Sequence, residues 1–270
     1  MKLVKPVQDF DFQSVDGNLQ YAMPQGSLEQ QQKVFVAGGF SWLPAVAVRE
    51  IIADNPEFWR NWYRNGTGAD YAHHEGGAIK LYLSPSNRIL TAKGDAFDKA
   101  LGSIRKTGNI PLDRPRIDAL VLDAQKNDAG IYVIDVDVLQ KNNKWVSDNR
   151  EWGHLVISTK DYAKQMQDSP DLAALVTPLY GTGVKLDRTM SQIRQRSRET
   201  LAFVLLPTYV RLNAPEGTGL ARLSALYYFN YFSDAIACGR SIDDSVAFAF
   251  GVRQRTAEGG CTENRLNLKR

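Results

Sequence analysis

Short apolar runs that end at glycine, proline or asparagine are the main pattern of the first 158 residues. Runs of about four to eight residues rich in β-branched and aromatic side chains predict β-strands, and the residues that end them predict turns. The predicted strands are 33–37, 78–83, 117–122, 130–139 and 154–158. Helical spacing of apolar residues between these runs predicts helices at 44–52, 57–63 and 95–104.

The pattern changes near Thr159, after which helical spacing dominates. The helices predicted there are 160–167, 171–175, 188–206, 218–238 and 241–253. Because strands and helices segregate along the chain, we expect an α+β fold. A strand-rich N-terminal region (about 1–158) would pack with a mainly helical C-terminal region (about 159–270). The connector that begins at Pro178 is the expected boundary between a mixed strand/helix region (1–177) and a helical basic region (178–270), and a single domain remains an alternative.

Composition limits the class of protein. Hydrophobic residues make up 43% and charged residues 23% of the 270 residues, as in folded globular proteins. No apolar run approaches the roughly 18 residues of a membrane span, and the first residues lack the apolar stretch of a signal peptide. Cys238 and Cys261 form neither a disulfide framework nor a zinc-ligand pattern. We therefore expect a cytoplasmic protein that does not insert into a membrane.

Positive charge gathers in the last third of the chain. Residues 181–270 contain 13 Lys and Arg against 8 Asp and Glu, a net charge of +5, whereas the other 180 residues carry −2. Eleven of these 13 cations are arginine, which binds phosphate in a bidentate manner. The candidate nucleic-acid-binding residues are Arg188, Arg194, Arg196, Arg198 and Arg211. A solvated helix face with no ligand is the alternative interpretation of the same cluster.

Two closely spaced aspartates suggest a metal site as an alternative to the nucleic-acid hypothesis. Asp135 and Asp137 lie two positions apart in the predicted strand 130–139, so both are expected on one face. Such carboxylates repel each other unless a divalent cation or hydrogen bonds compensate them. Enzymes that transfer nucleotidyl or phosphoryl groups use such pairs to hold Mg or Mn. His154 and Asp187 are candidates for a third ligand, and an ordinary amphipathic strand is the alternative.

Three functions follow from these patterns. The leading hypothesis is a nucleic-acid-associated binding or assembly protein that contacts the phosphate backbone of single-stranded DNA or RNA through its basic C-terminal region. The second is a metal-dependent transfer enzyme with catalytic Asp135, Asp137 and His154, in which Asp135 and Asp137 hold Mg or Mn. The third is a structural subunit of a larger complex, with other protein subunits as partners. The sequence does not decide whether the chain is an enzyme.

Overall fold

The computed structural model describes residues 3–4, 11–14, 19–55, 58, 62–126, 130–147, 153–195, 199–227 and 247–254. The helices are α1 (Leu28–Gly38), α2 (Ala45–Asp54), α3 (Arg88–Thr91), α4 (Asp95–Thr107), α5 (Arg114–Lys126), α6 (Val136–Asn142), α7 (Tyr162–Asp168), α8 (Pro170–Tyr180), α9 (Gly183–Gln195) and α10 (Pro207–Asn213). The strands are β1 (Leu3–Val4), β2 (Asp11–Ser14), β3 (Leu19–Ala22), β4 (Ser41–Trp42), β5 (Trp62–His73), β6 (Ile79–Ser84), β7 (Ile110–Leu112), β8 (Tyr132–Asp135), β9 (Trp145–Ser147), β10 (Gly153–Ser158), β11 (Thr200–Leu205), β12 (Thr218–Tyr227), β13 (Phe248–Ala249) and β14 (Gly251–Gln254).

A central sheet holds the molecule together, in the order β7-β12-β5-β6-β8, with β13 also pairing with β5. Its two longest strands, β5 and β12, are antiparallel and separated by more than 140 residues of chain. Every residue of β5 after Trp62 is buried, because the sheet is covered on both faces. Two smaller sheets flank it, β1-β2-β3-β14-β4 and β11-β10-β9. In the first of these, β14 lies between β3 and β4, so segments near both ends of the chain share one sheet.

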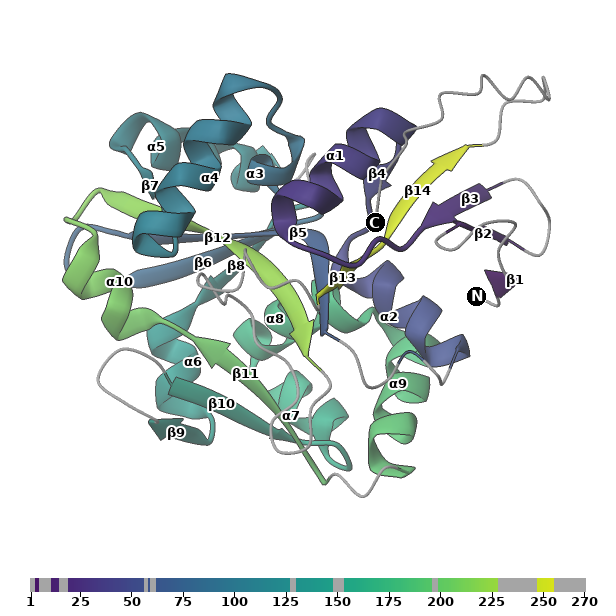
Figure 1. Ribbon diagram of the computed structural model, residues 1–270. Helices are drawn as coiled ribbons and strands as arrows, with labels where there is room; N and C mark the ends of the chain where they lie inside the picture. The colour runs from purple at the N-terminus through teal and green to yellow at the C-terminus, as the bar shows by residue number, and fades with distance from the viewer. Residues whose placement is uncertain are drawn as a thin grey trace.

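Helices pack on the two faces of the central sheet (Figure 1). One face is covered by α3, α4 and α5, whose buried residues include Phe97, Leu101 and Leu120. The opposite face packs on α2, α6 and α8 in the larger core, where Ile51 and Leu175 are fully buried. The same core extends to the small sheet β11-β10-β9. Burial of this apolar surface is the main term that stabilises the fold.

Mixed helices and antiparallel sheets confirm the expected α+β class. The predictions of helices at 44–52 and 95–104, and of strands at 78–83 and 154–158, agree with α2, α4, β6 and β10. The expected division along the chain is not confirmed, since α1 and α2 precede residue 55 and β11, β12 and β14 follow residue 199. Among the described residues, no helix has both the length and the apolar character needed to cross a membrane.

Several local predictions are wrong for identifiable reasons. The run 33–37 lies in α1, where Ser27 and Gln30 form a capping box and Gly39 ends the helix in the left-handed conformation. Residues 117–122 lie within α5. The predicted helix 188–206 ends earlier as α9, and β11 follows it. The start of the predicted helix 218–238 is strand β12, because β5 and β7 pair with it on both sides.

The pairing of β12 with β5 requires a glycine at position 219. A Cβ atom there would lie 2.1 Å from the carbonyl oxygen of Tyr71, a backbone atom that cannot rotate away. We expect Gly219→Ala to lower the free energy of unfolding by about 2 kcal/mol, as other overpacked sites do. Urea denaturation measures this change. Gly102→Ala is the matched control, because nothing lies within 4 Å of its Cβ position in α4, and equal losses in both variants would contradict the prediction.

Candidate functional site

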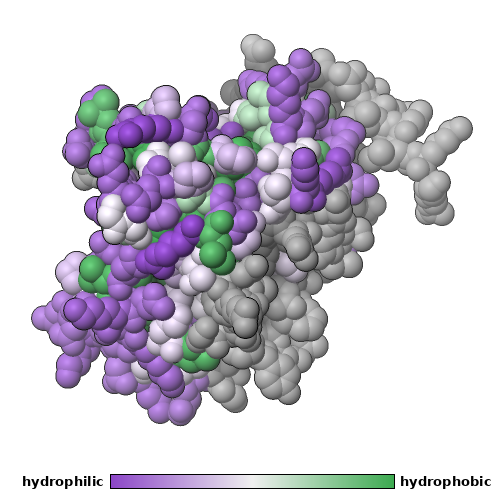
Figure 2. Space-filling view, turned by 90° about the vertical axis from the view of Figure 1, so that its left-hand side faces the viewer, coloured by the Kyte–Doolittle hydropathy of each residue, from purple (hydrophilic) through white to green (hydrophobic). Residues whose placement is uncertain are grey.

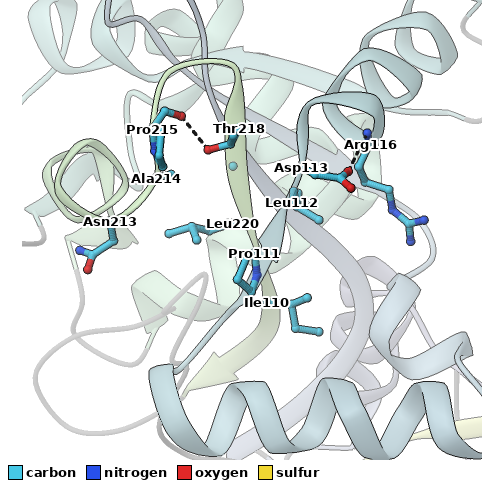
Figure 3. Close-up of a pocket in the computed structure, with 11 residues that line it drawn as sticks. Ile110, Pro111, Leu112, Asp113, Arg116, Asn213, Ala214, Pro215, Thr218 and Leu220 are labelled. Carbon is cyan, nitrogen blue, oxygen red and sulfur yellow. Dashed lines mark hydrogen bonds between the residues drawn. The ribbon is translucent and has the colours of Figure 1, made fainter.

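A hollow with a volume of about 510 Å³ lies at the edge of the central sheet. It is formed by edge strand β7, the first turn of α5, and the turn that joins α10 to β12 (Figure 3). We call it the edge pocket. Its lining residues are Ile110, Pro111, Leu112, Asp113, Arg116, Asn213, Ala214, Pro215, Thr218, Gly219 and Leu220.

The turn between α10 and β12 is fixed by hydrogen bonds. The backbone N–H and the hydroxyl of Thr218 both donate to the carbonyl of Pro215, at 3.1 and 2.6 Å. His73 at the end of β5 accepts from the N–H of Gly217 at 2.7 Å. Nδ1 of His73 donates to the carbonyl of Ala214 at 2.7 Å, since a carbonyl can only accept. One wall of the edge pocket is therefore fixed to the central sheet.

The floor of the edge pocket is apolar. Leu220 and Ala214 are only 3% exposed, and Pro111 lies beside Leu220 in the pairing of β7 with β12. Pro111 occupies the middle of the edge strand and has no N–H to offer to a further strand. Pro111 therefore disfavours the addition of a further strand at this edge.

Polar groups flank this floor on opposite sides in Figure 3, with Asn213 on one side and Asp113 and Arg116 on the other. Oδ1 of Asp113 accepts the backbone N–H of Arg116 at 3.1 Å, which fixes the start of α5. Nδ2 of Asn213 donates to the carbonyl of Tyr209 at 2.8 Å. The guanidinium of Arg116 is exposed, and within the described residues it forms no ion pair. These groups can contact a ligand that reaches across the floor.

A buried carboxylate lies close to the same arginine. Asp70 of β5 is 5% exposed, and its side-chain carboxylate accepts no hydrogen bond from the residues that the structure describes. Burial raises the pKa of the Asp70 carboxyl to about 6, and the charges of Arg88 and Arg116 act in the opposite direction. The electrostatic field of Arg116 therefore acts both on Asp70 and on the edge pocket.

The two aspartates of the metal hypothesis do not share a strand face. Strand β8 ends at Asp135, whose Oδ1 accepts the N–H groups of Asp137 and Val138 and caps α6. Asp137 belongs to that helix, accepts from the N–H of Ile79 at 3.0 Å and pairs with Arg211. The prediction of one strand over 130–139 is therefore wrong, because the Asp135 side chain satisfies the first N–H groups of a helix.

His154 lies on β10 in the separate three-stranded sheet, where it is 8% exposed. Asp187, in α9, accepts a hydrogen bond from the hydroxyl of Tyr162. The part of the chain that the structure describes contains no group of three His, Cys, Asp or Glu side chains that could hold a metal ion. A transfer activity that uses Asp135, Asp137 and His154 stays a prediction, without the geometry on which it was based.

The three candidate arginines that the structure describes lie on two helices. Arg188 in α9 pairs with Asp54, and Arg211 in α10 pairs with Asp137 and donates to the carbonyl of Gly77. Arg194 is exposed in the last turn of α9. Arg196 and Arg198 lie outside the described residues. Nucleic-acid binding through this cluster stays a prediction, in which two of the five guanidinium groups are already bound to carboxylates.

Sequence reasoning did not find the edge pocket. Its two halves, 110–116 and 213–220, are about 100 residues apart and each consists of turn residues at the ends of regular elements. The signal that was present is the proline in each half, Pro111 and Pro215, which indicates an edge or a turn. Only the pairing of β7 with β12 places the two halves together.

Comparison with known proteins identifies the fold. No family model matches the chain, and no curated protein matches it. A solved structure described as "Accommodation of massive sequence variation in Nanoarchaeota by the C-type lectin fold" is similar over 90% of this chain and 100% of its own, with a TM-score of 0.52 and 12% identity. At this identity the likeness extends to the fold alone, so the chain has a C-type lectin-like fold.

Proposed function

We propose that this chain is a binding protein on a C-type lectin-like scaffold, and that its edge pocket takes an extended peptide segment of a partner. The observation that carries this proposal is the arrangement of the pocket, an apolar floor with polar groups on two opposite sides. A volume of about 510 Å³ lies within the usual range of ligand pockets.

The floor selects for apolar side chains. Ile110, Pro111 and Leu220 present hydrocarbon surface, and no ionised group lies between them in Figure 3. A leucine-sized side chain that leaves water there contributes about 2 kcal/mol to binding. The side of the molecule with β7 and α10 is turned to the viewer in Figure 2, where small hydrophobic patches lie among hydrophilic side chains.

The charge at the pocket selects for an acidic end. Arg116 can donate two parallel hydrogen bonds to a carboxylate, the geometry that guanidinium groups favour. Asp113 is already engaged by the backbone N–H of Arg116, so its carboxylate supports the helix start. On the opposite side, the amide oxygen of Asn213 can accept a peptide N–H. A C-terminal peptide with apolar side chains satisfies the floor and both sides.

The similar structure supports a binding role in a second way. Its description attributes the accommodation of massive sequence variation to the C-type lectin fold. A scaffold that tolerates variation needs a constant buried frame that carries exposed variable positions. In this chain β5 and β12 form a buried frame, and the edge pocket combines buried floor residues of that frame with exposed residues at its margin, Pro111, Asp113, Arg116, Asn213 and Pro215. A buried frame with exposed residues at its margin is suited to the recognition of a partner.

Peptide binding to variants of two arginines in the first turn of α5, Arg116 and Arg114, tests the proposal. We expect the peptide acetyl-Ala-Leu-Leu with a free carboxylate to bind, and its C-terminal amide to bind about tenfold more weakly, because one charge-assisted contact is lost. Arg116→Gln should weaken binding of the free carboxylate by a similar factor. Isothermal titration calorimetry measures both changes.

Arg114→Gln is the matched control, since Arg114 lies two residues away, pairs with Glu75 at 2.9 Å and does not line the edge pocket. Equal affinity of the acid and the amide, or equal loss in both arginine variants, would overturn the proposed function.

A further inference from the structure

A second hollow, with a volume of about 430 Å³, lies between the end of α1, strand β4 and the turn before α3. We call it the aromatic hollow. Its lining residues are Gln32, Phe35, Val36, Gly39, Phe40, Ser41, Trp42, Gly66, Pro85, Ser86, Asn87, Leu90, Thr91 and Lys93. None of these residues lines the edge pocket, so the two hollows are separate sites.

Hydrogen bonds within the protein fix the aromatic wall. The indole N–H of Trp42 donates to Oε1 of Gln32 at 2.7 Å, and Nε2 of Gln32 donates to the carbonyl of Leu90 at 3.0 Å. The Trp42 ring meets Phe35 edge-on, with 4.6 Å between the ring centroids. Because Trp42 needs no further polar partner, its partly exposed surface offers an apolar contact.

Phe40 completes this wall. The guanidinium carbon of Arg253 lies 4.6 Å from the centroid of the Phe40 ring, and Nη1 of Arg253 donates to the carbonyl of Gly38 at 2.6 Å. Gly38 leaves room for the Phe40 ring, since a Cβ atom on Gly38 would lie 2.5 Å from it, and a Cβ atom on Gly251 would lie 2.8 Å from the Phe35 ring. The aromatic wall is therefore a rigid surface.

The rim of the aromatic hollow is polar and carries one positive charge. Ser41, Ser86 and Thr91 are exposed residues that carry hydroxyl groups. The Thr91 hydroxyl already donates to the carbonyls of Asn87 and Arg88, so towards a ligand it can accept a hydrogen bond. The ammonium group of Lys93 is exposed, and within the described residues it has no ion pair. The buried amide of Asn87 is not available to a ligand, because it already bonds to backbone groups of Arg222, Thr67 and Ile89. The groups that remain for a ligand are thus an aromatic wall, hydroxyls and a cation.

We infer that the aromatic hollow binds a nucleotide, with the base on the wall formed by Trp42 and Phe40 and the phosphate on Lys93. A nucleotide is the ligand that uses all three components, since its ribose hydroxyls match Ser41, Ser86 and Thr91. Stacking of one base on an aromatic side chain is worth about 1–3 kcal/mol and tolerates any base. The same chemistry is offered by a free nucleotide and by one residue of a single strand.

Fluorescence titration with adenosine 5′-monophosphate tests this inference. We expect the nucleotide to change the tryptophan emission of the protein, to which Trp42 contributes with four other tryptophans, and adenosine to bind about tenfold more weakly because the phosphate contact is lost. Lys93→Gln should reduce affinity for the nucleotide by the same factor while leaving adenosine unchanged. Lys99→Gln is the matched control, since Lys99 is an exposed lysine of α4 that does not line the hollow.

A short oligodeoxyadenylate separates the two sources of the ligand. Tighter binding of the oligomer than of the monophosphate assigns the hollow to single-stranded nucleic acid, and equal binding assigns it to free nucleotides. Because Lys93→Gln leaves Trp42 and Phe40 unchanged, the test does not depend on a substitution in the aromatic wall. Equal affinity of nucleotide and adenosine, or equal affinity of the Lys93→Gln and Lys99→Gln variants, overturns the inference.

Discussion

Asp70→Asn is expected to make the protein more stable than the wild type at pH 7, by up to about 3 kcal/mol. Asp70 is 5% exposed in the core beneath α3 and α5, and its pKa is raised from 3.8 to about 6 because burial disfavours the charged form. Ionisation of this carboxyl in the folded protein is therefore costly. An asparagine of nearly the same shape carries no charge and avoids that cost.

The raised pKa of Asp70 determines how the stability of the wild type changes with pH. Between about pH 4 and pH 6 the folded protein binds more protons at Asp70 than the unfolded chain does, so the wild type loses stability as pH rises through this window. Below pH 4 both states hold the proton, and the difference between wild type and Asp70→Asn should vanish. Urea denaturation at pH 4, 5, 6 and 7 measures it.

A surface carboxylate provides the comparison for this experiment. Asp118→Asn lies on the exposed side of α5 and should change stability by less than about 0.5 kcal/mol at each pH. If Asp70→Asn is less stable than the wild type at pH 7, then the charges of Arg88 and Arg116 stabilise the Asp70 carboxylate by more than its burial costs, and the assigned cause is refuted. A gain that persists unchanged at pH 4 would likewise refute the assigned cause.

The sequence was sufficient to predict a helix or strand where the residues of that element alone determine its secondary structure. Helix α4 has apolar residues at Phe97, Leu101 and Ile104 with acidic residues in its first turn and basic residues in its last, so its pattern and charges agree. In strand β6 the apolar residues Ile79, Leu81 and Leu83 alternate with Lys80 and Tyr82, as expected when successive side chains point to opposite faces of a sheet. In both, the local signal and the tertiary environment favour the same state.

Local signals failed where distant pairing decides. Residues 218–227 carry Leu220, Leu223 and Leu226 at helical spacing, but the segment forms β12 because β5 and β7 supply hydrogen bonds on both of its edges. The opposite error occurred at Val34, Phe35 and Val36, whose β-branched and aromatic side chains favoured a strand. There the Ser27 capping box and the Gly39 helix end determined the state.

The same distinction applies to the candidate sites. Asp135 and Asp137 were chosen from a spacing that has a meaning only in an extended strand, and capping of α6 by Asp135 removed that meaning. The edge pocket and the aromatic hollow each combine segments from distant parts of the chain, so no local window could reveal them. The sequence signals for the two sites were prolines and glycines at the ends of helices and strands, which indicate turns and edges but not a pocket.

The buried contact between Arg64 and Gln31 explains how the N-terminal and C-terminal segments are joined to the central sheet. Arg64 of β5 is 2% exposed, and its Nη1 donates to the carbonyl of Gly26 at 2.8 Å and to Oε1 of Gln31 at 2.9 Å. Nε2 of Gln31 donates to the carbonyl of Ala247 at 2.7 Å and to that of Pro24 at 3.3 Å. One amide thus links β5 to segments more than 200 residues apart in the chain.

Gln31→Leu is therefore expected to lower the free energy of unfolding by about 3 kcal/mol or more. Leucine fits the volume but leaves the Arg64 guanidinium and two carbonyls without this buried partner, at about 1–3 kcal/mol each before relaxation. Urea denaturation measures the loss, and Gln30→Leu is the matched control, because Gln30 is exposed and contributes only the capping box, worth about 1 kcal/mol. A loss in Gln31→Leu no larger than in Gln30→Leu would mean that the pairing of β14 with β3 and β4, together with apolar packing, holds these segments without the Gln31 contact. A markedly larger loss in Gln31→Leu means that the Gln31 amide adds substantially to strand pairing in holding residues 24 and 247 on the frame that carries both hollows.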